Sequence, residues 1–508
     1  MLRRVLQAAS AILFGNVMTR IGGLITVPLF LRYWSTARYG EYLALFAAVA
    51  YLSSLDIGLQ GAAVNRLTQA YAREDLGEYK IVQHTALVFF LSLASVATIV
   101  AVSIAWTLPI SRWLGLSLTP PATTTVVVVL LAINLTWSMP VQLLVATHQT
   151  TGNMARTQWI RNIQQMVVVA LTALALMLGA GMKAIALLQV LVVALLATFI
   201  LIEIRWRVPE LSPGLRLASL SVLKELSKPG LLFALIMVGN LIAYEGSVLL
   251  TSALLGGIAV AVLSVSKSLA DVIRLGLYSV TLALCPDYAR MESLGALEQL
   301  RRTHRITVAA TATVTLAIVS TLWYEGAQFI RWWTRGRMEP DPMLLRLFLV
   351  LVAFQTSWAA SSTVARASNR HHAQAIGYFF AAALGISLVA VLLKPLGTWA
   401  VPLGLTLGEA VCCYHFVIKE SCRIVGEPYA KFAVRFWFGF TVVSLSALAV
   451  GWTIHMMPLP MLMRWAALGI CSFAVVGILG WMLWLTPEDR ALLLPKLQRP
   501  FATSEARA

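Results

Sequence analysis

Residues 82–108, VQHTALVFFLSLASVATIVAVSIAWTL, decide the fold class of this chain. The stretch contains no Asp, Glu, Lys or Arg, and a helix needs about 20 mostly apolar residues to cross a bilayer. Similar stretches recur along the 508 residues, of which 59% are hydrophobic and 12% charged. The mean hydropathy is +0.80. Because a soluble domain cannot bury so many long apolar runs, we expect an all-α, polytopic membrane protein.

Apolar runs of this kind alternate with short polar links, which predicts about 14 membrane-spanning helices. Their approximate ranges are 8–33, 41–68, 82–108, 122–147, 157–180, 183–203, 229–252, 258–286, 305–328, 342–365, 372–394, 398–420, 432–455 and 463–485.

Lys and Arg are distributed unequally between the two sets of alternating links. About 25 of the 39 lie in links on the same side as the N-terminus, among them Arg156 and Arg161, and about 10 lie on the other side. Because Lys and Arg favour the cytoplasmic side, we expect both termini in the cytoplasm. The net charge of +17 then reflects topology and contact with anionic inner-leaflet lipid. Nucleic-acid binding would need these charges gathered on one soluble face.

The chain contains an internal repeat with a period of about 217 residues. Tyr71-Ala72-Arg73 recurs as Tyr288-Ala289-Arg290, and the same offset pairs Gly40 with Gly257. Six spans separate equivalent helices, so the repeats are parallel and predict two lobes around an axis along the membrane normal, with a substrate path between them. The predicted divisions are an N-terminal lobe (1–203), a cytoplasmic linker (204–228), a second six-helix lobe (229–424), and two extra spans with a cytoplasmic tail (425–508).

Eight ionisable residues lie at membrane depth, where charge is costly and by default suggests function. They are Arg20, Asp56, Arg66, Glu245, Lys267, Asp271, Arg274 and Glu409. We estimate depth in the membrane by counting residues from the predicted turns at about 1.5 Å each. Arg20 and Asp56 then lie at similar depths and could pair, and so could Glu245 and Lys267. Lys267, Asp271 and Arg274 share one helix face. One interpretation is structural: the formal charges of the eight sum to zero, so they neutralise one another and hold helices together.

The opening helices carry a series of motifs. These are Gly22-Gly23-x4-Pro28-Leu29-Phe30-Leu31, Tyr39-Gly40-Glu41-Tyr42, Leu55-Asp56-Ile57-Gly58-Leu59 and Arg66. The series resembles the polysaccharide transporter (O-antigen and exopolysaccharide flippase) family of the multidrug/oligosaccharidyl-lipid/polysaccharide (MOP) exporter superfamily. The resemblance implies a non-enzymatic flippase of the bacterial inner membrane. Such proteins move undecaprenyl-diphosphate-linked oligosaccharides to the outer leaflet by alternating access, for lipopolysaccharide or exopolysaccharide synthesis. A polysaccharide polymerase and chain-length proteins are the implied partners, besides membrane lipid.

This resemblance gives the intramembrane charges a second interpretation. Arg20 and Arg66, and less directly Lys267 and Arg274, would bind the diphosphate, because a guanidinium group suits bidentate phosphate contacts. Asp56, Glu245, Asp271 and Glu409 would hold these cations in ion pairs, or carry a proton or sodium ion for coupling. Glu409 has no obvious partner in the sequence, which favours it as a protonated acid. No cofactor is expected. The five cysteines match neither a disulfide set nor a metal site.

Several other classes of protein were considered. The sequence contains no Gly-x4-Gly-Lys-Ser/Thr loop and no link long enough for a nucleotide-binding domain, which argues against an ATP-driven pump. A membrane glycosyltransferase or polymer ligase would need outer catalytic acids or a large loop, and the predicted outer links are short and poor in acids. A drug/cation antiporter of the same superfamily fits the lobes but not the opening motifs. A lipid II flippase shares the lobes and the cavity arginines, so it stays close to the first interpretation.

Overall fold

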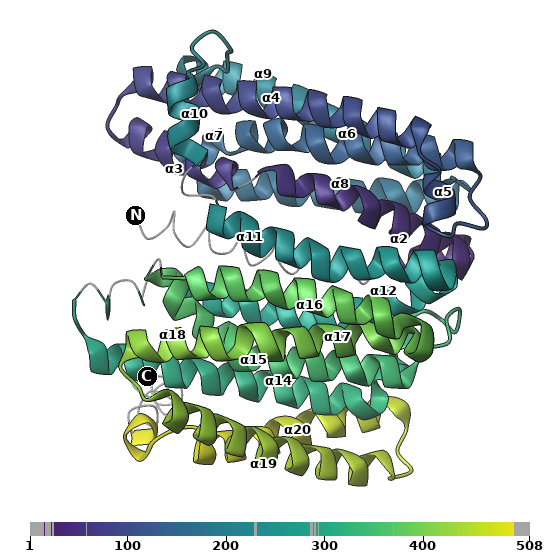
Figure 1. Cartoon of the computed structure of the whole chain (residues 1–508), viewed down its shortest axis with the longest axis vertical. Coiled ribbons are helices and arrows are strands. Elements are labelled where there is room, and N and C mark those ends of the chain that lie inside the picture. Colours follow the sequence, from purple (N-terminus) through teal and green to yellow (C-terminus); the bar gives the residue numbers. More distant parts are fainter. Residues whose placement is uncertain are drawn as a thin grey trace, which may run out of the picture. The chain divides into compact units, whose positions relative to one another are not determined.

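The computed structural model describes residues 25–491 except 57, 228–230, 285–287, 289–290, 293 and 369, together with Gly15 and Gly22. Across this part of the chain the regular elements are all helical (Figure 1). Ten of the helices found there are long and apolar enough to cross a membrane. The predicted all-α, polytopic fold class is confirmed.

Individual spans differ from the prediction in two ways. Two of the ten stretches, Ala234–Arg274 and His372–Val425, each contain two of the predicted spans. The first is interrupted at Gly256, whose φ of 80° falls in the left-handed region that favours glycine. The predicted span 41–68 is divided into α2 (Thr36–Ala50), a 3-10 turn η1 (Tyr51–Asp56) and α3 (Leu59–Ala72). Most of the predicted span 8–33 lies outside the described residues, so the number 14 stays a prediction.

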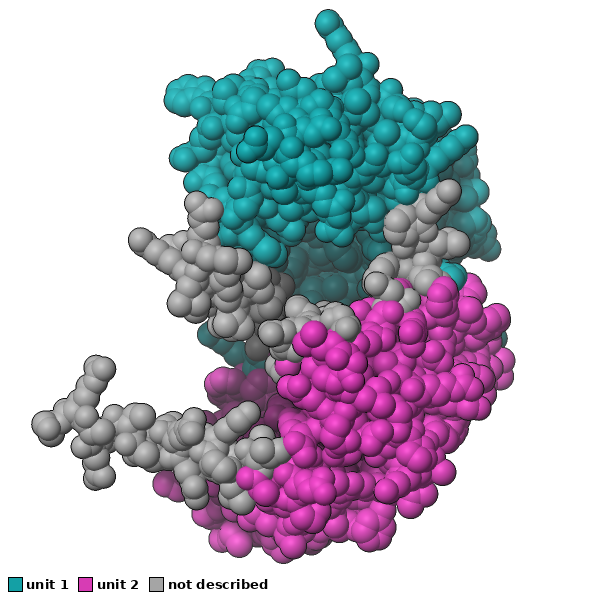
Figure 2. Space-filling model, turned by 90° about the vertical axis from the view of Figure 1, so that its left-hand side faces the viewer, with its two compact units in different colours: residues 1–265, 333–339, 393–398 teal, residues 266–332, 340–392, 399–508 magenta. Residues whose placement is uncertain are grey.

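The chain forms two compact units, which Figure 2 shows in different colours. Unit 1 comprises residues 1–265, 333–339 and 393–398, and unit 2 comprises residues 266–332, 340–392 and 399–508. The boundaries of the two predicted lobes stay a prediction. In unit 1, Arg337 donates to the carbonyl oxygens of Leu31 and Arg32 at 3.3 and 3.1 Å, so a segment from the second half of the sequence packs against the first.

In unit 1, long helices pack side by side around one apolar core. After α2, η1 and α3 its elements are α4 (Leu76–Thr107), α5 (Ile110–Trp113), α6 (Pro121–Val145), α7 (Thr147–Thr150), α8 (Met154–Met177), α9 (Met182–Arg207), η2 (Pro209–Leu211), α10 (Leu220–Ser227), α11 (Leu231–Asn240), the π-helical η4 (Leu241–Glu245) and the first part of α12 (Gly246–Ala283). The core joins α3, α4, α6 and α9 through buried side chains such as Leu67, Phe90 and Ile200.

The outer side of unit 1 is as apolar as its core. On α9 the side chains of Leu187, Leu191, Leu195, Phe199 and Trp206 are all exposed, while Ile185, Val192 and Ile200 are buried. A helix that is hydrophobic all round belongs in a large core or a membrane. The exposed stripe therefore marks the lipid-facing surface.

Unit 2 contains the rest of α12 and the helices that follow. These are α14 (Leu297–Trp333), α15 (Pro342–Ala367), most of α16 (His372–Leu396), α17 (Ala400–Glu409), the π-helical η6 (Ala410–Tyr414), α18 (His415–Val425), α19 (Tyr429–His455) and α20 (Met461–Leu483). The last two pack together as a hairpin, hereafter the α19–α20 hairpin.

Small residues bring this hairpin close to its neighbours. Gly439, Val443, Ala447 and Gly451 follow one another every fourth residue on the buried side of α19, and α20 buries Leu468, Ser472, Val476 and Gly480 in the same way. Helices in lipid associate through such small-residue faces because their backbones can then approach closely. Tyr324 of α14 donates to the Leu448 carbonyl at 2.8 Å, which joins the hairpin to α14 within unit 2.

Candidate substrate and coupling site

Glu409, predicted to be a coupling residue, ends α17 and is 4% exposed. Close helix packing fixes its position, because a Cβ on the adjacent Gly408 would overlap the Ala381 carbonyl oxygen of α16. The π-helical η6 begins at the next residue, and π-helical turns are frequent at functional sites. The sequence thus places one carboxylate rigidly inside the bundle.

Two neutral donors on α15 hold this carboxylate. Gln355 Nε2 donates to Glu409 Oε1 at 2.6 Å, and Trp358 Nε1 donates to Oε2 at 3.1 Å. Hydrogen bonds of this kind stabilise the ionised group without neutralising it. A buried intramembrane carboxylate whose hydrogen-bond donors are neutral can take up and release a proton or a sodium ion, which is the chemistry of coupling.

A small cavity lies near this group in unit 2, and its lining combines polar side chains with apolar surface. Arg274, Thr281, Thr311, Gln355 and Thr356 line most of it, and its volume is about 20 Å³. A space of that size holds one water molecule. Gln355 both lines the cavity and donates to Glu409, so the cavity connects the carboxylate to α12 and α14.

The predicted trio on α12 forms a local ion cluster. Asp271 lies 3.0 Å from the guanidinium of Arg274 and 3.9 Å from the ammonium of Lys267. Arg274 also lines the small cavity. The cluster therefore places two cations and one carboxylate together in unit 2, next to the space that Gln355 lines.

Arg66, predicted to be a cavity residue, is engaged by two carboxylates. Its Nε lies 3.0 Å from Glu78 of α4 and its Nη1 lies 2.6 Å from Glu225 of α10. Glu78 also pairs with Arg73 at 3.0 Å. In this structure Arg66 therefore links α3 to α4 and to the linker helix α10, and a phosphate would have to displace those carboxylates.

The remaining predicted residues occupy different surroundings. Asp56 ends η1 and accepts from the backbone N–H of Gln60 at 3.0 Å, so it caps the start of α3. Glu245 ends the π-helical η4 and is half-buried. Arg20 lies outside the described residues, so its pairing with Asp56 stays a prediction. Glu245 belongs to unit 1 and Lys267 to unit 2, and their pairing stays a prediction as well.

An apolar cavity of about 270 Å³ lies in unit 2 between α14, α15, α17 and α19. Its lining includes the aromatic side chains of Trp323, Phe354, Trp437 and Phe440. The volume exceeds the roughly 150 Å³ of an engineered protein cavity that stays dry and binds benzene. Residues of α15 thus line two cavities in unit 2: this apolar one, which is large enough for part of a hydrocarbon chain, and the small one lined by Arg274 and Gln355.

Two buried carboxylates that sequence analysis did not single out fasten the α19–α20 hairpin to α14. Glu325 of α14 is 2% exposed and bonds to His455 Nδ1 at 2.7 Å, to Arg464 Nη2 at 3.0 Å and to Trp465 Nε1 at 3.1 Å. The sequence does give one indication of Glu325, because it is an acidic residue within the predicted span 305–328. Its partners lie too far along the chain to be paired with it from spacing alone.

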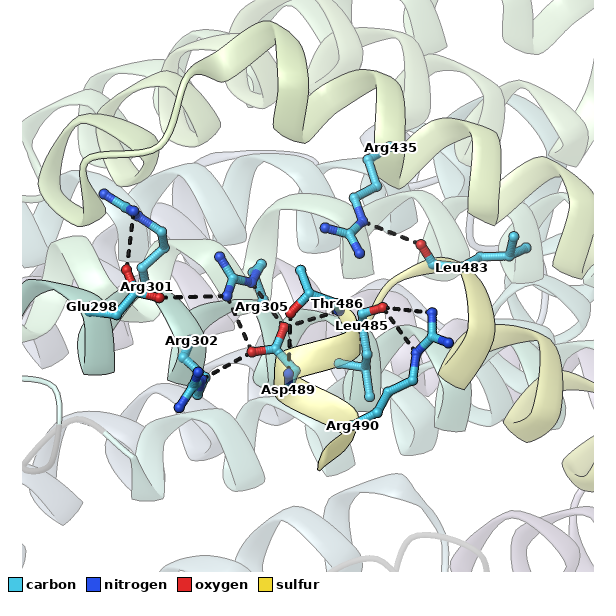
Figure 3. Close-up of polar contacts among 10 residues, drawn as sticks. All are labelled: Glu298, Arg301, Arg302, Arg305, Arg435, Leu483, Leu485, Thr486, Asp489 and Arg490. Carbon is cyan, nitrogen blue, oxygen red and sulfur yellow. Dashed lines mark hydrogen bonds and ion pairs between the residues drawn. The ribbon is translucent and has the colours of Figure 1, made fainter. Parts of the chain in front are cut away.

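Asp489, the second of these carboxylates, follows the hairpin and is fully buried (Figure 3). It bonds to Arg302 and Arg305 of α14, each at 3.1 Å. The backbone N–H of Thr486 donates to Asp489 Oδ2 at 3.1 Å, and the backbone N–H of Asp489 donates to Thr486 Oγ1 at 3.2 Å. Thr486-x-x-Asp489 matches the capping-box pattern, which is the sequence signal for a short helical turn here.

Acid is expected to weaken this attachment. Burial raises the pKa of Asp489, but hydrogen bonds from Arg305 and Thr486 outweigh it, so the pKa lies below its ordinary value. A depressed folded-state pKa adds stability above the unfolded-state pKa of about 3.9, and that stability is lost as pH falls through the folded value. Between pH 5 and pH 3 the thermal unfolding midpoint of purified protein should fall more steeply for the wild type than for Asp489→Asn. Parallel curves would contradict the prediction.

Known proteins were compared with the chain by sequence and by structure. No protein-family model matches the sequence, and no curated protein matches it. A solved structure of an inward-facing multidrug resistance MATE family transporter of the MOP superfamily is 14% identical, with a TM-score of 0.70 over 81% of this chain and 95% of that one. Lipid II flippase MurJ in an inward closed conformation is 12% identical, with a TM-score of 0.70 over 94% of this chain and 99% of that one.

A eukaryotic MATE transporter is also similar, at 16% identity and a TM-score of 0.54 over 83% of this chain and 99% of that one. At these identities the likeness shows the fold alone. The chain has the fold of MOP-superfamily transporters, a group that contains both drug transporters and a lipid flippase.

Proposed function

We propose that this protein is a flippase for undecaprenyl-diphosphate-linked oligosaccharides, which it moves from the inner to the outer leaflet by alternating access. It acts in O-antigen or exopolysaccharide synthesis, in the inner membrane of a bacterium, with both termini in the cytoplasm. A polymerase and chain-length proteins are its proposed partners. The opening motifs favour this family, and the MOP-type fold suits a transporter of amphipathic molecules.

The apolar cavity of unit 2 is the observation that carries this proposal. A lipid-linked sugar must keep a long hydrocarbon tail in an apolar environment while its headgroup crosses. The cavity between α14, α15, α17 and α19 offers about 270 Å³ lined almost entirely by apolar and aromatic side chains.

The intramembrane charges are proposed to bind the diphosphate and the coupling ion. Arg20, Arg66, Lys267 and Arg274 are the proposed ligands of the diphosphate. Asp271 holds Lys267 and Arg274 in place, as Glu78 and Glu225 hold Arg66, until the phosphate oxygens replace the carboxylates. Glu409 is the proposed carrier of a proton or sodium ion, because its partners Gln355 and Trp358 are neutral.

A deletion strain tests the proposal. Undecaprenyl-linked sugars are extracted from it, and their accessibility to a membrane-impermeant label is measured from the periplasmic side. Accumulation of a complete but inaccessible oligosaccharide is the expected result and identifies the cargo. Accumulation of lipid II instead would make the chain a lipid II flippase. Normal levels and normal exposure of both would favour a drug antiporter.

Replacing Glu409 with glutamine tests the coupling role. The amide keeps the size of the side chain and an acceptor for Trp358 but cannot carry a proton, so gradient-driven translocation in proteoliposomes should fall at least tenfold while the protein stays folded. The matched control is Glu420→Gln on the neighbouring helix α18, where the carboxylate pairs with Arg423 at 3.5 Å. A Glu409→Gln variant that responds to an imposed pH or sodium gradient like the wild type would exclude Glu409 as the carrier.

A further inference from the structure

One side of α8 in unit 1 is polar at membrane depth. Gln158, Arg161, Gln164 and Gln165 lie on this side, while the opposite side exposes Ile163, Met166, Leu174 and Met177. Arg161 is seven residues beyond the first residue of α8, about 10 Å along the axis, and Gln165 is about 16 Å along it. The count of Lys and Arg in links included Arg161, although the predicted span 157–180 contains it, and the structure places Arg161 within α8.

Arg161 bonds to one end of a short chain of amide side chains. Its Nε donates to Gln142 Oε1 of α6 at 3.0 Å, and Gln142 Nε2 donates to Gln164 Oε1 at 3.1 Å. Gln158 Nε2 donates to Asn162 Oδ1 at 3.0 Å. In the described part of the chain the guanidinium uses only its Nε in these bonds, and the group that accepts from it is uncharged.

Three other arginines of the described helices do bond to carboxylates, whereas Arg366 donates to the carboxamide of Gln374 at 2.9 Å, as Arg161 does to that of Gln142. Arg66 pairs with Glu78 and Glu225, Arg156 pairs with Glu203, and Arg274 pairs with Asp271. A cation at membrane depth is costly unless an anion or several polar groups compensate it. For Arg161 the described residues supply an amide, which leaves a negative charge to be supplied by a ligand.

We propose that this α8 face binds the glycosyl diphosphate headgroup of the substrate, with Arg161 on the phosphate and the carboxamides of Gln158, Gln164 and Gln165 on the sugar. The inference rests on the proposed function and adds a headgroup site in unit 1. A guanidinium matches phosphate oxygens bidentately. A carboxamide offers two donors and an acceptor, which suits neighbouring hydroxyl groups of a sugar.

Binding to the full chain in nanodiscs tests the site. The probe is a C55 polyprenyl diphosphate carrying one N-acetylhexosamine, and the sugar-free polyprenyl diphosphate is the reference. Loss of a charge-assisted contact should weaken binding of both probes about 10- to 100-fold in Arg161→Gln. Gln165→Ala should weaken binding of the sugar-bearing probe only. Arg112→Gln on the exposed α5 is the matched control that removes one positive charge elsewhere.

Each outcome decides between the two proposals. If the wild type binds the sugar-bearing probe and Arg161→Gln binds it equally well, the headgroup site is wrong and the proposed function stands. If the wild type binds neither probe, both proposals are wrong. If Arg161→Gln does not fold, Arg161→Lys decides, since it keeps the charge and loses the bidentate geometry. A folded Arg161→Lys variant with wild-type affinity and unchanged preference for the sugar overturns the site.

Discussion

Replacing Gly40 with alanine is expected to prevent unit 1 from assembling. Gly40 of α2 packs on Gly257 of α12, and a Cβ at Gly40 would overlap the Gly257 carbonyl oxygen. The reverse change fares little better, since a Cβ at Gly257 would lie 2.6 Å from the Ala37 carbonyl oxygen. The obstacle in each case is backbone, which cannot rotate away as a side chain can. We expect a loss of at least about 3 kcal/mol, at the upper end of overpacking costs.

The measurement is the yield of monodisperse protein and its thermal unfolding midpoint in detergent. Gly61→Ala is the matched control: Gly61 lies within α3, and a Cβ there would meet nothing within 4 Å. In an exposed helix position alanine is favoured over glycine by about 0.5–1 kcal/mol, so this variant should be as stable as the wild type or more so. A Gly40→Ala protein with wild-type yield and midpoint would show that the helices do not cross at these glycines.

Replacing Glu41 with alanine is expected to be the second severe change. Glu41 is fully buried, and its Oε1 accepts the backbone N–H groups of Ser117 and Leu118 at 2.7 and 2.8 Å. Its Oε2 accepts the Thr119 hydroxyl at 2.5 Å. Alanine would remove the acceptor of three donors, of which the Thr119 hydroxyl is buried and the two N–H groups are partly buried. A buried donor left unsatisfied costs about 1–3 kcal/mol, and a partly buried one costs less. The segment between α5 and α6 should therefore detach from α2.

Hydrogen exchange of residues 115–119 and the unfolding midpoint measure this effect. Glu41→Gln should be intermediate, because its amide oxygen still accepts one of the backbone donors. The control is Glu210→Ala in the exposed η2 turn. If Glu41→Ala and Glu210→Ala gave the same midpoint and the same exchange, the anchoring role of Glu41 would be refuted.

The sequence predicted the fold class well because apolar length is a property of each segment by itself. It failed where tertiary geometry decides. The predicted continuous span 41–68 breaks around Tyr51–Asp56, and α3 begins after Gly58, whose φ is 70°. The offset of 217 residues paired Gly40 with Gly257, and the structure places these two glycines against each other. The repeat marks Gly40 and Gly257 as equivalent positions, but it does not predict that they are in contact.

The candidate site was predictable only where partners are close in sequence. The spacing of Lys267, Asp271 and Arg274 anticipated their cluster, because residues three and four apart share a helix face. Arg66 was expected near a cavity, yet Glu225, 159 residues away, bonds to it. Arg161 was counted with a link because helix ends are uncertain by a few residues. Only the structure could show that an amide accepts from it.

The bonds of Glu325 to the α19–α20 hairpin have a consequence for how the chain is synthesised. Its partners His455 and Arg464 lie 130 and 139 residues further along the chain. During translation α14 must therefore enter the bilayer long before the groups that compensate its glutamate exist. The nascent protein passes through a stage in which this acid is protonated or sheltered by other factors, since a bare carboxylate in lipid is costly. Completion of the last two helices ends that stage, because only then can His455 and Arg464 bond to the carboxylate.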